Sequence, residues 1–218
     1  MRSLPFAPLT IVLVLLAAAC GGSSSVASSD EVSETTGATT ETTTTFDGEE
    51  TAPVEVSGGE LPSTEEPGIL NDPNIDPAIG KIAPTLKGTN FNGTDVTIGP
   101  DGRPKVVYFL AHWCGHCQTE VDLITDLVAD GKQPAEIDLY AVAIAVRDDA
   151  DNYPPSVWLA NFPGTVMRDT ADSDGAIASG VSGIPYAIYL DGDNTVLSRS
   201  IGSLPEEQVL SQWASLVP

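Results

Sequence analysis

The chain has 218 residues and a formal net charge of −22, with 31 Asp and Glu against 9 Lys and Arg. This balance argues against a nucleic-acid partner, because phosphate binding needs clustered Lys and Arg. Three cysteines are too few for a framework of structural disulfides. We interpret Cys20 as a processing cysteine, and Cys114 and Cys117 as a reactive pair.

The first 19 residues have the pattern of a signal peptide. Arg2 provides the positive charge, and residues 9–19 form an apolar stretch that is too short for a comfortable membrane span. Small residues, Ala17–Ala19, then precede Cys20. This order resembles a bacterial lipoprotein signal, in which the cysteine is lipidated and becomes the mature N-terminus. We expect a lipoprotein anchored at Cys20 on the extracytoplasmic side of a bacterial membrane; the alternative is a secreted protein.

Residues 20–79 are rich in Ser, Thr, Glu, Gly and Pro, and residues 21–80 carry 13 acidic side chains and no Lys or Arg. Such a segment buries too little apolar surface to offset the entropy lost on ordering. We therefore predict a disordered tether over 20–79, followed by one folded domain over 80–218.

The folded domain alternates between strand and helix patterns. Asn92-Gly93, between Phe91 and Val96–Ile98, predicts a hairpin, and the apolar run Lys105–Ala111 predicts a buried strand. The other expected elements are helices at 118–129, 155–161, 173–179 and 205–216, strands at 137–146 and 165–167, and a hairpin of 186–190 with 195–201. This order predicts an α/β fold with a central mixed sheet and helices on both faces.

Cys114-Gly115-His116-Cys117 follows the buried strand and opens a helix. The unpaired N–H groups and the dipole of a first helical turn favour a thiolate at Cys114. We expect Cys114 to be the exposed nucleophile, and Cys117, which lies deeper, to resolve the mixed disulfide. His116 is expected to stabilise the thiolate by a hydrogen bond or positive charge. The alternative is that His116 is an ordinary exposed residue.

Two residues before the motif are further candidates. His112 is a candidate modulator of the cysteine pKa values, although an exposed histidine near a site is common. Trp113 is expected to shield the disulfide and contact substrate, rather than to pack in the core. Ile184-Pro185 precedes a predicted strand, and a proline that cannot donate to the ladder belongs at a strand's start, in a bond type that can be cis.

Three segments resemble the thioredoxin superfamily, and specifically its extracytoplasmic TlpA/ResA-like branch: Ile82–Pro84, Val107–Cys114 and Gly180–Pro185. The resemblance implies a thioredoxin-like three-layer sandwich with an N-terminal β-hairpin extension. It also implies that Pro185 is cis and faces the disulfide, and that the backbone of Ile184 pairs with substrate like a neighbouring strand.

The same resemblance assigns a role to Glu120, which stands where this branch often carries a glutamate credited with modulating the cysteine pKa values. A surface glutamate is the alternative. Three departures matter as well. Tyr108 replaces the buried proton-relay aspartate of thioredoxin, and Asp122 replaces a common proline. Gly115-His116 resembles protein disulfide isomerases, which favours oxidation or isomerisation over reduction.

We therefore expect a thiol–disulfide oxidoreductase that acts on secreted or envelope proteins. The redox-active disulfide would be its only redox group, with no metal and no other cofactor. We expect a monomer, with a membrane protein as one candidate redox partner. The alternatives are a reductant, including one of the cytochrome c maturation type, and a non-catalytic surface scaffold. A zinc site of His112, Cys114, His116 and Cys117 is disfavoured because four ligands within six residues cannot easily form a tetrahedron. A peroxidase-like redoxin is a further alternative, but it would need a Thr-x-x-Cys site, which is missing from this sequence.

Overall fold

The computed structural model describes residues 48–217. The expected signal peptide, Cys20 and the first part of the expected tether lie outside the described residues. The described strands are β1 (Glu55–Ser57), β2 (Gly68–Leu70), β3 (Thr85–Thr89), β4 (Asp95–Ile98), β5 (Lys105–Leu110), β6 (Asp138–Ala143), β7 (Thr165–Arg168), β8 (Tyr186–Leu190) and β9 (Val196–Ile201). The described helices are α1 (Gly115–Ala129), α2 (Pro155–Trp158), α3 (Asp174–Ala178) and α4 (Glu206–Ser215).

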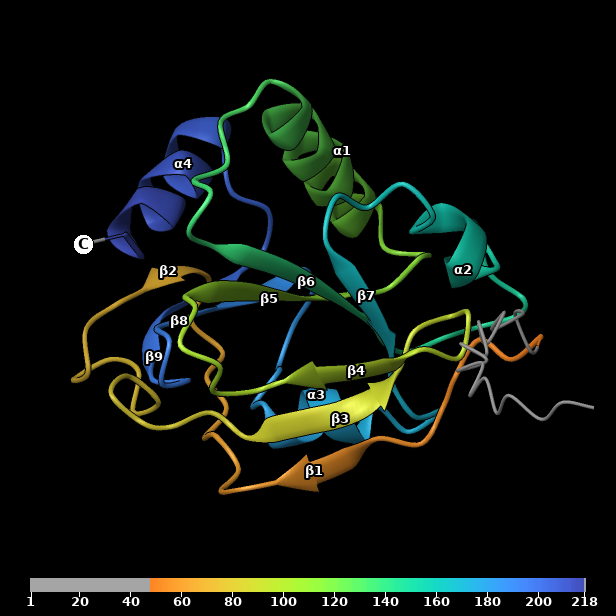
Figure 1. The fold of residues 1–218 in the computed structure, drawn as a ribbon, viewed down its shortest axis with the longest axis horizontal. Coiled ribbons are helices and arrows are strands. Elements are labelled where there is room, and N and C mark those ends of the chain that lie inside the picture. Colours follow the sequence, from red (N-terminus) through yellow and green to blue (C-terminus); the bar gives the residue numbers. More distant parts are fainter. Residues whose placement is uncertain (1–47, 218) are drawn as a thin grey trace, which may run out of the picture. The chain divides into compact units, whose positions relative to one another are not determined.

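A six-stranded sheet lies at the centre of the domain, in the order β2-β9-β8-β5-β6-β7. Strand β5 pairs in parallel with β6 and antiparallel with β8 (Figure 1). All six residues of β5 are buried, as its nearly unbroken apolar run predicts. The expected mixed central sheet, with a thioredoxin-like arrangement around it, is confirmed.

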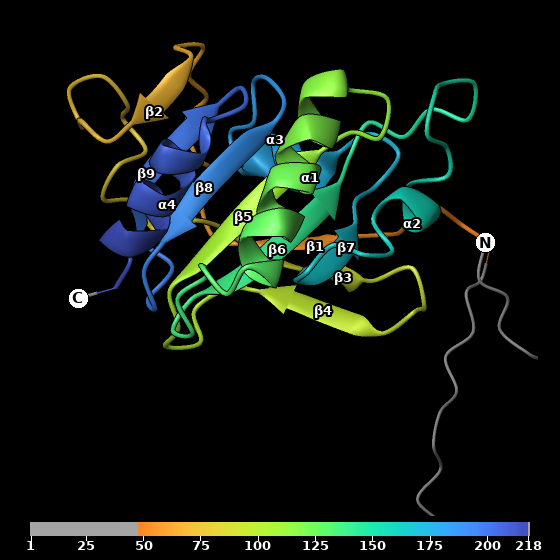
Figure 2. The same ribbon diagram turned by 90° about the horizontal axis from the view of Figure 1, so that it is seen from above.

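Helices α1 and α4 cover one face of this sheet (Figures 1 and 2). The side chains of a strand alternate between faces, so every second residue of β5 turns toward these helices. The apolar core on this side includes Val106, Tyr108 and Leu110 from β5, Val121, Ile124 and Leu127 from α1, and Val209 and Trp213 from α4. This core holds α1, and with it the first turn that carries the cysteines, against the central strand.

The opposite face is covered by α3 and a small sheet in the order β1-β3-β4. Its core includes Val107 and Phe109 from β5, Leu86 from β3, Val96 and Ile98 from β4, and Ala176 from α3. The expected N-terminal hairpin is β3 paired with β4. Phe91 lies in its turn rather than in a strand, because the Asn90 side chain accepts hydrogen bonds from the backbone N–H groups of Asn92 and Thr94.

The expected disordered tether is wrong for residues 48–79. Strand β1 pairs with β3, and β2 pairs with β9 at the edge of the central sheet. The Glu50 carboxylate accepts hydrogen bonds from the N–H and the hydroxyl of Ser156, at 2.8 and 2.7 Å. The carboxylate of Asp76 pairs with the guanidinium of Arg199, and both side chains are fully buried. The polar composition concealed these long-range contacts, and the folded domain begins well before residue 80.

Two helix bounds also differ from expectation. Helix α1 begins at Gly115 rather than 118, because Cys114 occupies its N-cap. Helix α2 ends at Trp158, and the chain then turns over residues 159–162 through backbone hydrogen bonds to reach β7. None of the helices between residues 48 and 217 has the length and apolar character needed to cross a membrane.

Candidate active site

Cys114 lies just beyond the end of β5 and caps α1. Its backbone is extended, with φ −84° and ψ 111°, and its Sγ accepts the backbone N–H of Cys117 at 3.3 Å. Cys114 is half-buried, whereas Cys117 is fully buried one turn into the helix. Both are free thiols. This geometry matches an accessible attacking sulfur with a shielded second sulfur behind it.

The loop before β8 brings Ile184 to the same place. Phe109 of β5 pairs with Tyr186 of β8, so the residues before β8 lie beside the residues that follow β5. The Cys114 Sγ is 3.9 Å from the Ile184 carbonyl oxygen, and the Ile184–Pro185 bond is cis. The cis bond that the resemblance implied is therefore present. Ile184 itself is partly exposed and Pro185 is buried.

Glu120 lies on the buried side of α1, with only 3% of its surface exposed. Burial raises its pKa to about 7, and a hydrogen bond from the Leu204 N–H at 3.3 Å partly opposes this. Burial also raises the pKa of the Cys117 thiol well above its usual range. The neighbouring Cys114 and the negative charge of Glu120 add to that rise. A carboxyl group that titrates near neutrality thus acts electrostatically on the buried thiol.

His116 is exposed on the first turn of α1. Its backbone carbonyl accepts a hydrogen bond from the Ser203 hydroxyl at 3.0 Å, and Leu204 next to it reaches Glu120. The segment after β9 therefore fixes the first turns of α1 through these two hydrogen bonds. No sequence pattern singled out Ser203 or Leu204, because their partners are a backbone oxygen and a side chain more than 80 positions away.

His112 is 1% exposed, and both of its ring nitrogens are occupied. Nδ1 lies 2.7 Å from the Asp151 carbonyl oxygen, and Nε2 accepts the Arg147 N–H at 3.1 Å. With Nε2 accepting this hydrogen bond, Nδ1 is the nitrogen that donates to the Asp151 carbonyl oxygen. The structure thus ties His112 to the loop after β6 instead of turning its nitrogens toward the cysteines. It also leaves no ring nitrogen free for the zinc alternative.

Trp113 is partly exposed and is held by the same loop. Its Nε1–H donates to the Ala145 carbonyl at 2.8 Å, and the Arg147 guanidinium lies 5.5 Å from the ring centre. A hollow of about 480 Å³ opens beside this pair; it is lined by Glu49, Glu50, Thr51, Val146, Arg147, Asp148, Asp149, Tyr153 and Ala171. These contacts hold Trp113 against the loop that follows β6, and its expected roles of shielding the disulfide and contacting substrate stay predictions.

Tyr108, at the position of the expected missing relay aspartate, is completely buried. Its hydroxyl accepts the indole N–H of Trp213 at 3.1 Å, and its ring packs edge-on against Phe162. Burial raises its pKa well above the usual value, with a further contribution from Tyr189. Tyr108 is therefore a neutral core residue that connects β5 to α4. It cannot supply the carboxylate of the relay, and Glu120 is the carboxyl group whose charge acts on Cys117.

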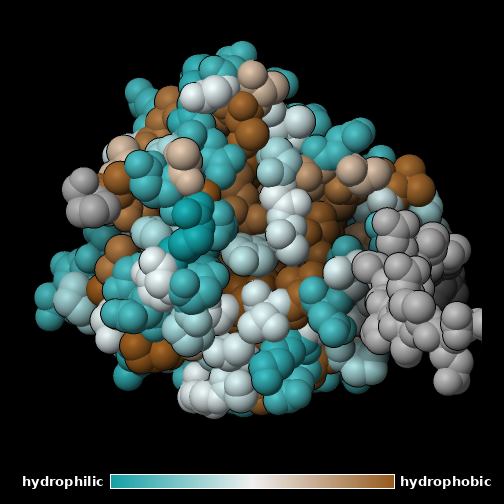
Figure 3. Space-filling view, viewed as in Figure 1, coloured by the Kyte–Doolittle hydropathy of each residue, from teal (hydrophilic) through white to brown (hydrophobic). Residues whose placement is uncertain are grey.

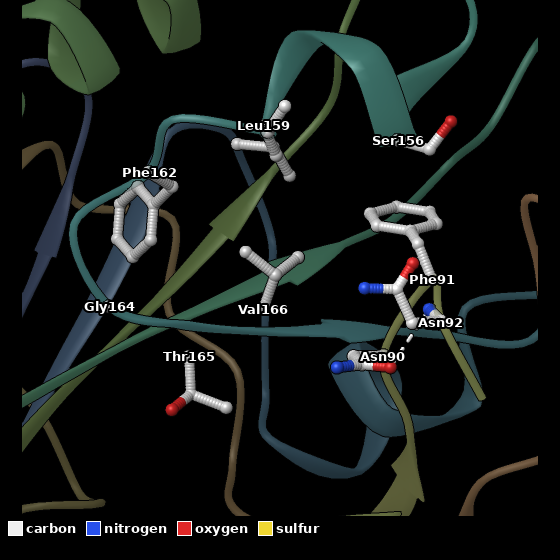
Figure 4. A pocket seen from close by; sticks show the side chains of 10 residues that line it. Asn90, Phe91, Asn92, Ser156, Leu159, Phe162, Gly164, Thr165 and Val166 are labelled. Carbon is white, nitrogen blue, oxygen red and sulfur yellow. Dashed lines mark hydrogen bonds between the residues drawn. The ribbon is translucent and has the colours of Figure 1, made fainter. Parts of the chain in front are cut away.

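Other hollows lie away from the cysteines, and two of them adjoin α2. One, of about 560 Å³, lies between the turn that joins β3 to β4 and the chain from α2 to β7. Figure 4 shows its lining side chains, among them Phe91, Ser156, Leu159 and Val166. Figure 3 shows hydrophobic residues gathered between α1 and α2, where a hollow of about 420 Å³ is lined by Val121, Asp122, Thr125, Asp126, Trp158, Asn161 and Phe162. Neither contains Cys114, Cys117 or Ile184.

No protein-family model matches the chain. The thiol:disulfide interchange protein HelX of Rhodobacter capsulatus is 29% identical over 147 residues, which are 64% of this chain and 78% of HelX. The thiol:disulfide interchange protein DsbE of Yersinia pestis is 27% identical over 135 residues, which are 58% of this chain and 65% of DsbE. The chain therefore spans slightly less than two thirds of that second relative.

Solved structures have the same fold. A thiol:disulfide interchange protein DsbE from Chlorobium tepidum aligns with a TM-score of 0.53 at 24% identity, covering 64% of this chain and 98% of that one. A DsbF homologue from Corynebacterium diphtheriae aligns with a TM-score of 0.54 at 14% identity, covering 72% and 99%. Together with the paired cysteines at the head of α1, these similarities show a thiol–disulfide oxidoreductase of thioredoxin-like fold.

Proposed function

We propose that the protein exchanges disulfides with secreted or envelope proteins outside the cytoplasm, through Cys114 and Cys117. The observation that carries the proposal is the half-buried Cys114 sulfur at the N-terminus of α1, within 3.9 Å of the Ile184 backbone. The relatives named thiol:disulfide interchange proteins support protein thiols and disulfides as substrates. The N-terminal sequence supports the location, with a lipid anchor at Cys20.

The exchange needs only the two sulfurs and a proton acceptor. In the reducing direction the Cys114 thiolate attacks a substrate disulfide, and one substrate thiolate leaves. Cys117 then attacks Cys114 in the mixed disulfide, releases the second substrate thiol and closes the Cys114–Cys117 disulfide. Two thiols are oxidised and one disulfide is reduced, so the electrons balance. The oxidising direction is the same path reversed.

We assign to Glu120 the transfer of the proton to and from Cys117. A buried thiol with a raised pKa is a poor nucleophile and a poor leaving group unless a nearby group accepts or donates its proton. A carboxyl group with a pKa of about 7 can do either near neutral pH. Glu120 therefore serves both directions, and it does not by itself select one.

We favour oxidation or isomerisation as the direction, because Gly115-His116 resembles the dipeptide of protein disulfide isomerases. His116 is exposed beside the reactive turn, where a positive charge would stabilise the Cys114 thiolate. Reduction is the second candidate, and the raised pKa of Cys117 favours it. A leaving thiol with a high pKa departs slowly when the enzyme disulfide is attacked.

Two experiments test these proposals. The wild-type chain is expected to accelerate insulin reduction by dithiothreitol or the refolding of scrambled ribonuclease, and Cys114→Ala is expected to lack both activities. A chain inactive in both assays contradicts the function and supports the scaffold alternative. Equilibration of the Cys114–Cys117 pair with glutathione then decides the direction. A potential toward the upper end of the range of about −270 to −120 mV indicates an oxidant, and one toward the lower end indicates a reductant.

A further inference from the structure

A stretch of chain that composition assigned to the tether packs directly behind the loop that carries Ile184 and Pro185. We call residues 61–76 the brace, and residues 180–185 the substrate loop. The Leu61 N–H donates to the Ala178 carbonyl oxygen at 2.9 Å, at the end of α3. Further along, the hydroxyl of Ser182 donates to the Thr64 carbonyl oxygen. The brace and the substrate loop thus touch within two residues of Ile184.

Arg199 on β9 locks the brace to the same loop. Its side chain is fully buried, and its Nε and Nη2 donate to the two carboxylate oxygens of Asp76. Its Nη1 donates to the Pro62 carbonyl oxygen at 2.8 Å. The same guanidinium lies 5.8 Å from the ring centre of Tyr186, whose hydroxyl donates to the Gly180 carbonyl oxygen at 3.2 Å. One buried cation therefore contacts both ends of the brace and, through Tyr186, the beginning of the substrate loop.

The brace also comes close to the backbone of Gly180, the first residue of the substrate loop. Its φ is +71°, and a Cβ atom there would lie 2.8 Å from the Pro62 carbonyl oxygen and 2.9 Å from that of Leu61. Only glycine fits this position without moving the brace. Both the left-handed backbone and the closeness of the two carbonyl oxygens require it.

We propose that the brace positions the substrate loop for pairing with a polypeptide substrate, with Arg199 and Ser182 as positioning residues. The inference rests on the proposed function, in which a substrate strand pairs with the Ile184 backbone while its sulfur meets Cys114. Pairing of this kind requires backbone groups held in place before the substrate arrives, because ordering them during binding costs affinity. Ile184 itself is partly exposed, and the brace contacts its loop at Gly180 and Ser182.

The test compares two probes that react with the same sulfur. One is an unstructured peptide carrying a disulfide, which can pair with Ile184. The other is 5,5′-dithiobis(2-nitrobenzoate), which has no peptide backbone. Second-order rate constants are measured with the reduced full-length chain for Ser182→Ala, Ser182→Thr and their parent. All of these chains carry Cys20→Ser, because a free thiol at Cys20 would react with either probe, and this parent is the wild type of the comparison. Ser215→Ala is the matched control, because it removes a hydroxyl that donates to the Gln212 carbonyl at 2.7 Å at the far end of α4.

We expect Ser182→Ala to react roughly three- to tenfold more slowly with the peptide, the range that corresponds to the loss of one hydrogen bond. Its rate with the aromatic disulfide should stay within about twofold of wild type, and Ser182→Thr should restore the peptide rate. Gly180→Ala, which forces the brace away, should show the same selectivity with a larger loss. Ser215→Ala should match wild type with both probes.

Equal loss with both probes would show a general effect on Cys114 or on folding, and would overturn the inference. An unchanged peptide rate in Ser182→Ala would also overturn it, while the proposed function would stand on the activity of the wild type. A wild-type chain that reacts with neither probe would overturn the proposed function itself. Circular dichroism of each variant separates selective loss from misfolding, and Ser182, which is exposed, gives a variant expected to fold.

Discussion

The Sγ of Cys114 lies 3.9 Å from the carbonyl oxygen of Ile184, although 70 positions separate the two residues. The antiparallel pairing of β5 with β8 brings them together, because it places Phe109 opposite Tyr186. A polypeptide paired with Ile184 would present a sulfur to Cys114 without any rearrangement of the sheet.

Glu120→Gln is expected to flatten the dependence of folding stability on pH. Burial raises the pKa of Glu120 from 4.5 to about 7, so the folded state prefers the protonated carboxyl group. The contribution of this carboxyl group to folding stability is fully present below pH 4.5 and is lost as pH rises through about 7. Wild type should lose about 3 kcal/mol from this group between pH 4.5 and 8, and Glu120→Gln should not.

Urea unfolding at several pH values measures this difference. Glu207→Gln is the matched control, because it makes the same substitution at an exposed glutamate on α4. It should follow wild type throughout. If Glu120→Gln shows the same pH dependence as wild type, Glu120 is not a buried carboxyl group in the folded protein.

Glu120→Gln should also slow the resolution of the mixed disulfide, by about 10²-fold if Glu120 accepts the Cys117 proton. Loss of the negative charge would by itself lower the pKa of Cys117 and speed the step. Burial is the larger cause of the raised pKa, however, and it remains in the variant. Stopped-flow measurement of product release after the attack by Cys114 shows which of these two opposing effects is larger. A faster resolving step in Glu120→Gln would show that charge repulsion, rather than proton acceptance, is its main effect.

Asp76→Ala is expected to cost roughly 3–5 kcal/mol of folding stability, because it leaves the buried Arg199 guanidinium without its carboxylate. Glu55→Ala removes an exposed partner of Lys87 at 3.7 Å and should cost no more than about 1 kcal/mol. Denaturant unfolding of both variants gives the comparison. Equal, small losses in both would mean that residues 61–76 are not packed as described.

Lipidation of Cys20 is tested in a bacterial host that processes lipoproteins. Wild type should incorporate radiolabelled palmitate and remain in the membrane fraction, and Cys20→Ser should do neither. The physical reason is that the small residues before Cys20 suit a lipoprotein signal, whereas a serine offers no thiol for the lipid. Release of unlabelled wild type into the medium would support secretion instead.

The elements nearest the cysteines were predictable because their signals are local. The apolar run of β5, the helical spacing on α1 and the turn residues between β8 and β9 each lie within one short window of sequence. Even the burial of Glu120 has such a signal. It falls between Cys117 and Val121 on the same helical stripe that buries Ile124. The resemblance identified Glu120, but the spacing alone indicates its face.

The rest of the site could not be predicted because its partners are distant or belong to the backbone. Asp76 and Arg199 are 123 positions apart, and Glu50 and Ser156 are 106 apart. From composition alone, Asp76 and Glu50 are only two of the acidic residues in a polar segment. His112 was a candidate modulator of the cysteine pKa values because of its position in the sequence. Its ring nitrogens instead contact backbone groups of a loop whose path no periodic pattern specifies.

Trapping of the mixed disulfide tests whether Cys114 is the attacking sulfur. The chain carrying Cys117→Ala is incubated with a disulfide-bonded protein substrate and examined by non-reducing electrophoresis and mass spectrometry of the Cys114 peptide. We predict a covalent complex through Cys114 that accumulates because no second thiol resolves it, and none with Cys114→Ala. Absence of the complex in Cys117→Ala, or an equal amount in Cys114→Ala, would contradict a nucleophilic Cys114 and the exchange mechanism built on it.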